Sequence, residues 1–217
     1  MYKTVVFDLD GTLLNTLTDL ADAGNRLCRK YGWPTHECQA YRYFVGNGIP
    51  KLVERLAPAD QRTPAVLEAA LADFKRDYGQ HLRDTTAPYP GIPEMLAKLK
   101  ANGVQLAVFS NKADALAKEV VKDYFGTQYF TIVRGQMTGV APKPAAEGTN
   151  ALLQALHADP ASTLYVGDSN VDVETAHNAS LPCCGAVWGF RTREELNAAG
   201  AEYLAENSDE LYDVIMK

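Results

Sequence analysis

The sequence predicts an α/β fold in which helices flank a parallel β-sheet and one helical segment is inserted. Three observations support this class. Short apolar runs recur along the chain and end in polar residues, as Val5-Val6-Phe7 does before Asp8. From Pro90 onward, strand and helix patterns alternate, which is typical of a parallel sheet with right-handed crossovers. Between the first run and Pro90, we find only helical periodicity.

The first strand is expected over Val5 to Phe7, because a run of β-branched and aromatic residues is typical of a strand buried on both faces. Asp8, Asp10 and Gly11 follow it directly. In open α/β sheets, ligands bind beyond the carboxyl ends of the strands. Two such close carboxylates need a cation or a shared proton. These residues are therefore either a strand end with an Asp-Gly turn, or a nucleophile or metal ligand (Asp8) with a proton donor (Asp10).

The inserted segment should contain three helices. The first is expected to begin at Thr16, with Asp19 completing a capping box, and to end at Gly32. A second helix could open at Pro50, and a third should start at Thr63-Pro64. Their apolar stripes are interpreted as packing surfaces.

The order of elements also sets the expected domain boundaries. We place the helical insertion at residues 15–86, and the core at residues 1–14 and 87–217. The junctions near Leu14-Asn15 and Ala87-Pro88 would then be hinges.

Three later segments repeat the design of a strand that ends in polar groups. They are Gln105 to Phe109 before Ser110-Asn111-Lys112, Thr131 to Val133 before a loop with Pro142-Lys143-Pro144, and Thr163 to Val166 before Gly167-Asp168-Ser169 and Asp172. Carboxylates bind a hard divalent cation, usually Mg²⁺, and hydroxyl, amide and ammonium groups are the donors that a phosphoryl group requires. The four strand ends together predict a phosphoryl-transfer site.

In these four segments the chain resembles the haloacid dehalogenase superfamily of aspartate-nucleophile phosphatases and mutases. The matching motifs occur in the family's order and span most of the chain: Asp8-Leu9-Asp10-Gly11-Thr12, Ser110-Asn111, Lys143, and Gly167-Asp168-Ser169 with Asp172. Four motifs in register are a strong signal. The resemblance implies a Rossmann-like core and an inserted helical cap, of the C1 type, that closes over the site.

The resemblance also implies roles for the four aspartates. Asp8 would be the nucleophile that forms an aspartyl-phosphate, and Asp10 would act first as general acid and then as general base. The metal ligands would be Asp8, the main-chain carbonyl of Asp10, and Asp168, with Asp172 orienting water or neighbouring groups. Asp172 could also simply cap the helix that follows.

The phosphate-binding residues follow from the same motifs. Ser110, Asn111 and Lys143 would contact the phosphoryl oxygens and assist catalysis. Gly11 and Thr12 are also expected to bind the phosphate or the substrate. Ser110 could instead be a helix N-cap, or could do both, and Lys143 could be a solvated loop residue. Lys112 is expected to be a surface lysine, and none of the four histidines lies at a predicted strand end.

Two looser resemblances point to phosphoglycolate phosphatases. Tyr43 to Arg55 looks like their cap loop and helix, and Trp188 to Leu196 looks like their C-terminal segment. Gly46-Asn47-Gly48 could be an ordinary turn, or a substrate loop whose glycines let backbone amides approach an anion. The nearby Arg42 and Lys51 are either substrate contacts or solvated helix charges.

Composition bounds the remaining expectations. The 217 residues are 47% hydrophobic, with no apolar run of transmembrane length, and the first strand leaves no room for a signal peptide. The four cysteines lack metal-ligand or redox spacing. A net charge of -6 argues against nucleic acid as a partner. We expect a cytoplasmic monomer or homodimer without membrane or nucleic-acid partners.

These observations predict a Mg²⁺-dependent phosphomonoester hydrolase that acts on 2-phosphoglycolate or a similar small phosphorylated metabolite. Two alternatives stay open from the sequence. The same core could serve a sugar-phosphate mutase similar to β-phosphoglucomutase, or a protein that binds a phosphorylated metabolite without turnover.

Overall fold

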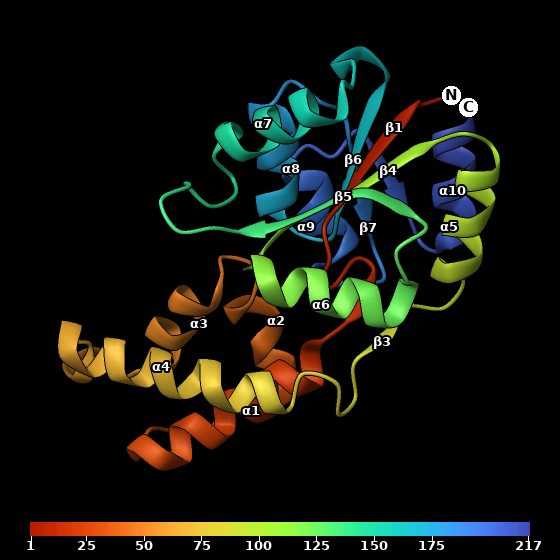
Figure 1. The fold of residues 1–217 in the computed structure, drawn as a ribbon. Helices are drawn as coiled ribbons and strands as arrows, with labels where there is room; N and C mark the ends of the chain where they lie inside the picture. Colours follow the sequence, from red (N-terminus) through yellow and green to blue (C-terminus); the bar gives the residue numbers. More distant parts are fainter. The chain divides into compact units, whose positions relative to one another are not determined.

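The computed structural model describes residues 1–217, and the chain divides into two compact units. The first unit, called the core below, comprises Met1–Leu14 and Pro88–Lys217. The second, called the cap, comprises Asn15–Ala87. The predicted fold class is confirmed, because the core holds a parallel sheet with flanking helices and the inserted unit is helical (Figure 1).

Six strands form the core sheet in the order β5-β4-β1-β6-β7-β8, and neighbouring strands run parallel. Phe7 pairs in register with Val108 and with Val166, so the residues after β1 and β6 emerge at the same edge. Both faces of β1 are buried, as is typical of a central strand in a parallel sheet. The strands are β1 (Thr4–Phe7), β4 (Gln105–Ala113), β5 (Phe130–Gln136), β6 (Thr163–Gly167), β7 (Cys183–Ala186) and β8 (Tyr203–Ala205).

Helices cover the core sheet. Figure 1 shows α5 and α10 side by side, apart from the group formed by α7, α8 and α9. Val6, Ala107 and Tyr165 point to this second group and pack in one apolar cluster with residues of α7, α8 and α9. The helices are α5 (Ile92–Ala101), α6 (Asp114–Phe125), α7 (Ala146–Leu156), α8 (Asn170–Asn178), α9 (Arg193–Ala198) and α10 (Ser208–Met216), with the short 3₁₀ turn η3 (Pro160–Ser162).

The cap is built from amphipathic helices around buried aromatic side chains, among them Tyr41, Phe74 and Tyr78. The first predicted helix ends as expected, because Gly32 takes a left-handed conformation after its last turn. Thr63 caps the third predicted helix by accepting a hydrogen bond from Val66. The elements are α1 (Leu17–Tyr31), η1 (Cys38–Ala40), α2 (Tyr41–Phe44), α3 (Ile49–Leu56), η2 (Ala59–Gln61) and α4 (Pro64–Gln80).

The predicted capping box at the start of α1 is wrong. Thr16 makes no side-chain cap bond. The buried Asp19 carboxylate instead accepts four hydrogen bonds, from the backbone N–H and the hydroxyl of both Thr85 and Thr86, at 2.5 to 2.9 Å. A long-range partner therefore replaces the local one, and Asp19 ties the first turn of α1 to the end of the cap segment.

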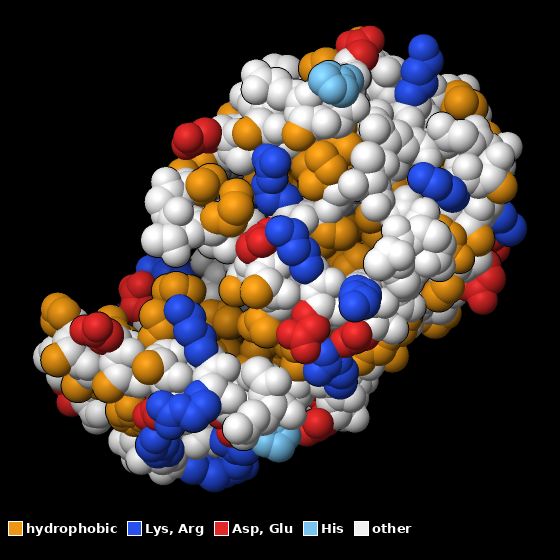
Figure 2. All heavy atoms as spheres, viewed as in Figure 1, with side chains coloured by type: hydrophobic (Ala, Val, Ile, Leu, Met, Phe, Trp, Pro, Cys, Tyr) orange, Lys and Arg blue, Asp and Glu red, His pale blue; other side chains and the backbone are white.

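The chain passes between the units at two short strands, β2 (Leu14–Asn15) and β3 (Ala87–Pro88), which pair with each other. No helix is both long enough and apolar enough to span a bilayer. On the face shown in Figure 2, Lys and Arg side chains are interspersed with acidic and apolar ones rather than joined in one basic surface.

Candidate active site

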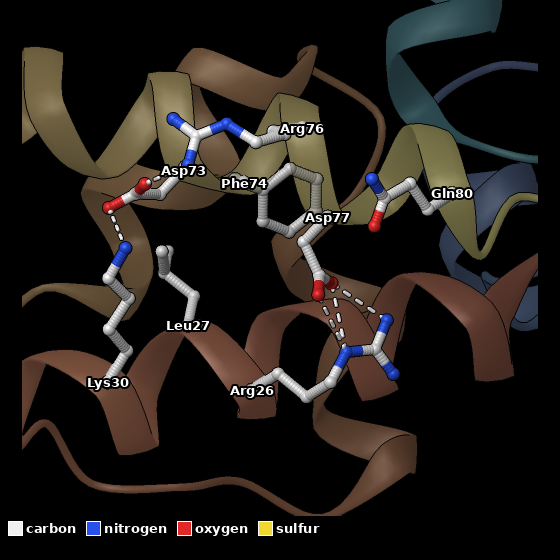
Figure 3. A pocket seen from close by; sticks show the side chains of 8 residues that line it. All are labelled: Arg26, Leu27, Lys30, Asp73, Phe74, Arg76, Asp77 and Gln80. Atoms are coloured by element: carbon white, nitrogen blue, oxygen red, sulfur yellow. Dashed lines mark hydrogen bonds and ion pairs between the residues drawn. The ribbon is translucent and has the colours of Figure 1, made fainter.

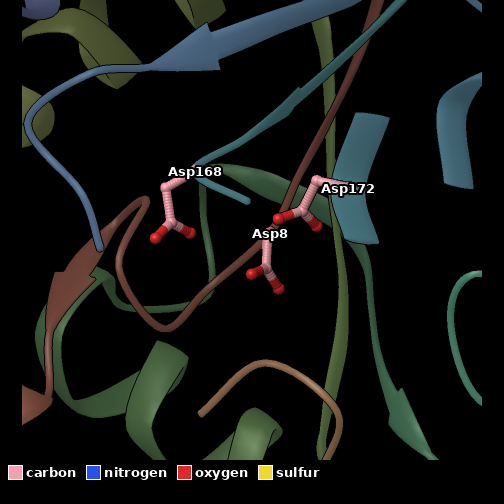
Figure 4. Close-up of side chains that lie close together, drawn as sticks. All are labelled: Asp8, Asp168 and Asp172. Carbon is pink, nitrogen blue, oxygen red and sulfur yellow. The ribbon is translucent and has the colours of Figure 1, made fainter. Parts of the chain in front are cut away.

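Three buried carboxylates converge at the carboxyl edge of the core sheet. Asp8 follows β1, Asp168 follows β6, and Asp172 lies in the first turn of α8. An oxygen of each lies within 4.8 Å of an oxygen of the other two (Figure 4). Their convergence follows from the parallel pairing of β1 with β6, which brings the ends of both strands to one place.

Lys143 supplies the positive charge in this cluster. Its Nζ lies 2.8 Å from Asp8 Oδ1 and 2.7 Å from Asp172 Oδ1, and it donates to the Tyr165 hydroxyl at 3.3 Å. Burial disfavours an ammonium, but the charges of Asp172 and Asp8 outweigh it and raise the pKa of Lys143 well above its usual value. Lys143 is therefore a fixed cation in the site rather than a solvated loop residue.

The Tyr165 contact was not predicted from the sequence. Tyr165 lies inside β6, where its ring packs in the apolar core, and its hydroxyl reaches Phe109 O at 3.4 Å as well as Lys143. An aromatic residue within a buried strand gives no sequence signal for a polar role.

Asn111 holds the backbone of Lys143. Its Oδ1 accepts from the Lys143 N–H at 2.8 Å, and its Nδ2 donates to the Lys143 carbonyl at 3.2 Å. This pair of bonds fixes the loop that carries the ammonium. Ser110 is also buried, and its hydroxyl oxygen accepts from the Lys112 N–H at 3.2 Å.

Ser110 is not a helix N-cap, which corrects one of the two sequence interpretations. The strand β4 runs on to Ala113, and Ala113 is the N-cap of α6. The register between β4 and β5 is irregular after Phe109, and the two strands pair again at Ala113, opposite Gln136.

The turn after β1 is shaped around Asp168. The Gly11 backbone has φ of +92°, and a Cβ at this position would collide with the Asp168 carboxylate. Thr12 Oγ1 donates to Asp168 Oδ1 at 3.1 Å. Gly11 and Thr12 thus place Asp168.

The segment after β7 also holds this turn. The Phe190 N–H donates to Asp168 Oδ2 at 2.7 Å, and the Trp188 indole N–H donates to the Thr12 carbonyl at 3.0 Å. The sequence resemblance singled out Trp188 to Leu196 without a role. The structure shows that its first residues orient an acidic side chain of the site.

Burial changes the acidity of the cluster. Loss of solvent is the largest effect on Asp8; Lys143 opposes it, Asp172 adds to it, and together they raise the pKa of Asp8 to about 7. Burial, followed by the charges of Asp172 and Asp8, also raises the pKa of Asp168 well above its usual value. The Lys143 ammonium therefore offsets only part of the cost of burying the Asp8 carboxylate.

Lys112 is not a surface lysine, which corrects the sequence expectation. Its side chain is 2% exposed, and its Nζ lies 3.0 and 3.3 Å from the two carboxylate oxygens of Asp10. With all groups ionised, the four carboxylates of the site carry four negative charges, and the paired ammonium groups of Lys112 and Lys143 offset two of them. The excess of two negative charges, on oxygen donors, fits a divalent cation such as Mg²⁺.

The predicted substrate residues of the cap lie at the turn between α2 and α3. Gly48 has φ of +82° and is the N-cap of α3. Arg55, which the sequence did not single out, donates to Asn47 Oδ1 and to the Phe44 carbonyl, each at 2.8 Å. Arg55 therefore shapes this loop.

The other predicted substrate residues of the cap lie in or beside this loop. Gly46, in the loop, has a left-handed backbone with φ of +115°. Arg42 lies in α2, and Lys51 lies in α3, where it pairs with Glu54 at 2.8 Å on the surface.

A separate hollow lies on the cap between α1 and α4 (Figure 3). Its cations are paired with acids, Arg26 with Asp77 at 2.8 Å and Lys30 with Asp73 at 2.6 Å. None of the predicted site residues lines it.

Comparison with known proteins agrees with this geometry. The family model of haloacid dehalogenase-like hydrolases matches residues 5–186. A phosphoglycolate phosphatase of Chromobacterium violaceum is 31% identical over 98% of this chain and 96% of its own length, and one of Thiobacillus denitrificans is 31% identical over 87% and 84%. A crystal structure of a Lactobacillus delbrueckii protein superposes with a TM-score of 0.93 at 28% identity, covering 99% of this chain and 98% of that one. The chain therefore belongs to the haloacid dehalogenase-like hydrolase family.

Proposed function

We propose that the protein is a Mg²⁺-dependent phosphomonoester hydrolase that acts through an aspartyl-phosphate on Asp8. The observation that carries this proposal is the pairing of the buried Asp8 carboxylate with the fixed ammonium of Lys143, next to Asp168. A carboxylate at a strand end is a competent nucleophile toward phosphorus, and an adjacent cation offsets the repulsion between it and the anionic phosphoryl group.

In the first step, an Asp8 oxygen forms a bond to phosphorus while the bond from phosphorus to the leaving oxygen breaks. Asp10 gives its proton to that oxygen, so the product leaves as an alcohol. In the second step, a water oxygen attacks phosphorus and Asp10 takes the proton from the water. The bond between phosphorus and Asp8 then breaks, which returns the Asp8 carboxylate and releases inorganic phosphate.

The other residues bind and orient. Lys143 contacts the phosphoryl oxygens, together with Ser110, and Asn111 holds the Lys143 backbone in place. Asp8, Asp168 and the Asp10 carbonyl would hold Mg²⁺, which when bound supplies positive charge to the phosphoryl group.

Asp172 acts on the phosphoryl group indirectly, through its contact with Lys143. Its Oδ1 pairs with Lys143, and its Oδ2 accepts from the N–H and the hydroxyl of Ser169. The same carboxylate caps α8, as the sequence allowed. With both oxygens engaged in this way, Asp172 orients Lys143 rather than serving as the primary metal ligand.

The proposed substrate is 2-phosphoglycolate or a similar small phosphorylated acid. Support comes from the names of the relatives, which are phosphoglycolate phosphatases, and from the resemblance of the cap loop around Gly46-Asn47-Gly48 to theirs. The substrate's leaving group would be an alkoxide, which needs the proton that Asp10 supplies.

The proposal is tested by phosphate release from p-nitrophenyl phosphate and from a panel of phosphorylated metabolites in the presence of Mg²⁺. We expect turnover, with 2-phosphoglycolate preferred to sugar phosphates. Binding of the metabolites without release would identify a binding protein, and conversion of a sugar monophosphate to its isomer would identify a mutase. Equal rates on all panel members would reject 2-phosphoglycolate as the preferred substrate but would still support phosphatase activity.

A further inference from the structure

We propose that Lys112 is a positioning residue for proton transfer, which holds the Asp10 carboxylate in the orientation that the reaction needs. This inference rests on the proposed function, because it concerns the acid-base step of that reaction. The observation behind it is the ion pair between Lys112 and Asp10, which involves neither the nucleophile nor the phosphate-binding residues.

The contact between Lys112 and Asp10 restrains the carboxylate as a whole. One nitrogen lies 3.0 Å from Oδ1 and 3.3 Å from Oδ2, so both oxygens are held by the same ammonium. Asp10 lies outside the named strands, in an isolated bridge with Leu14, and its side chain is 14% exposed. Lys112 lies on β4, the neighbour of β1, with its side chain 2% exposed. A buried lysine near the end of β4 thus holds a side chain that lies outside the named strands.

The burial of Lys112 sets this pair apart from an exposed lysine pair of the core. Lys118 also pairs with an aspartate, Asp114, at 2.7 Å, but its side chain is 57% exposed. Exposed pairs of this kind hold their geometry weakly, because water competes for both charges. A buried ammonium has no such competitor and is costly without its partner. The Lys112 contact therefore fixes geometry in a way that the Lys118 contact does not.

The two buried lysines divide the acids of the site between them. Lys143 pairs with Asp8, the proposed nucleophile, and with Asp172. Lys112 pairs with Asp10, the proposed acid and base. Each reacting carboxylate has its own fixed cation, so loss of Lys112 should disturb proton transfer and leave nucleophilic attack largely intact.

This division predicts that the effect of a Lys112 variant depends on the leaving group. An alkoxide requires a proton as the bond to phosphorus breaks, whereas p-nitrophenolate is stable enough to leave without one. If Lys112 orients Asp10, Lys112→Met should lower kcat/KM for an alkyl phosphate by up to about 10²-fold, within the range of general acid catalysis. The loss on p-nitrophenyl phosphate should be several-fold smaller.

The experiment measures kcat/KM for the wild type, Lys112→Met and Lys112→Arg on p-nitrophenyl phosphate and on the alkyl phosphate that the wild type hydrolyses best. Lys112→Arg should recover part of the lost rate on the alkyl phosphate, because it restores a cation. In an Asp10→Asn background, Lys112→Met should cause no further loss, since the carboxylate it orients is gone. Lys118→Met is the matched control and should behave as the wild type.

Equal losses on both substrates, or an unchanged or raised rate on the alkyl phosphate, would overturn the role of Lys112. Additive losses in the Asp10→Asn background would do the same. A wild-type protein that hydrolyses neither substrate would instead reject the proposed function. If thermal unfolding shows that Lys112→Met does not fold, Lys112→Gln and Lys112→Arg provide the same comparison of leaving groups.

Discussion

The ammonium nitrogen of Lys143 lies 2.8 Å from Oδ1 of Asp8, and both side chains are buried. The same nitrogen is 2.7 Å from Asp172. One fixed cation thus holds the proposed nucleophile beside a second acid, and its own backbone is anchored by Asn111. The pairing links the stability of the site to its chemistry.

The first prediction follows from this pairing. Lys143→Met should lower kcat by about 10²-fold or more, because the phosphoryl group loses a preorganised donor. It should also reduce the free energy of unfolding by about 3 kcal/mol, since two buried carboxylates lose their cation. Steady-state kinetics and urea denaturation measure both quantities. A fully active variant of unchanged stability would show that Lys143 is a passive loop residue.

The second prediction concerns the metal. Excess EDTA should stop phosphate release and Mg²⁺ should restore it, because the site carries more carboxylates than ammonium groups. Ca²⁺ should restore it poorly, since it prefers more ligands at longer distances. Undiminished release in excess chelator would reject the metal assignment.

The same site predicts how Mg²⁺ affects stability at different pH. Burial raises the pKa of Asp8 from 3.8 to about 7, so the folded protein holds a proton that the unfolded chain releases over that range. Without a divalent cation, stability should therefore fall as pH rises from about 4 to about 7. Added Mg²⁺ should raise Tm more at about pH 8 than at about pH 5. An equal rise at both pH values would contradict this linkage.

The third prediction concerns the cap. Asp19→Ala should reduce the free energy of unfolding by at least about 2 kcal/mol, because four hydrogen bonds to a buried carboxylate are lost. Asp22→Ala, on the exposed side of the same helix, is the control and should change it by less than about 0.5 kcal/mol. Similar stabilities for the two variants would mean that the Asp19 contacts add nothing to the cap.

The fourth prediction concerns substrate choice. If the cap loop binds the substrate's carboxylate, Gly48→Val should lower kcat/KM for 2-phosphoglycolate much more than for p-nitrophenyl phosphate. Valine at this position would have to adopt the positive φ of Gly48, which should reduce the free energy of unfolding by about 1–3 kcal/mol. Gly79→Ala, in the exposed part of α4, is the control. Equal losses on both substrates would show that the loop does not discriminate between them.

Arg42→Ala and Lys51→Ala extend this test to the cations of the cap. A fall in kcat/KM for 2-phosphoglycolate but not for p-nitrophenyl phosphate would identify the side chain that binds the carboxylate of the substrate. Lys51 already pairs with Glu54 on the surface, so we expect the smaller effect from this variant. If kcat/KM for 2-phosphoglycolate fell only in Lys51→Ala, Lys51 rather than Arg42 would be the side chain that binds the carboxylate.

Much of the site could be predicted because strand ends are local signals. An apolar run followed by Asp8 or Asp168 marks both the strand and its functional edge, and parallel pairing brings the two together. The burial of Lys112 could not be predicted, because its partner, Asp10, lies 102 residues earlier in the chain. The strand β4 extends to Ala113, so Lys112 belongs to the strand, and its side chain is buried.

The partners of Asp19 could not be predicted for a related reason. Its spacing from Thr16 matches a capping box, which is a local pattern. Thr85 and Thr86 lie far along the chain, and they offer four donors where the local pattern offers one. Long-range contacts of this kind leave no periodic trace in the sequence.

The central claim is that Asp8 carries the phosphoryl group, and phosphate release by Asp8→Asn tests it most directly. The amide is nearly isosteric with the carboxylate but is a very poor nucleophile, so we expect a folded protein without measurable turnover in the presence of Mg²⁺. Thermal unfolding confirms that the variant folds. Hydrolysis by folded Asp8→Asn within about tenfold of the wild-type rate, which corresponds to only about 1.4 kcal/mol in the barrier, would contradict the covalent mechanism.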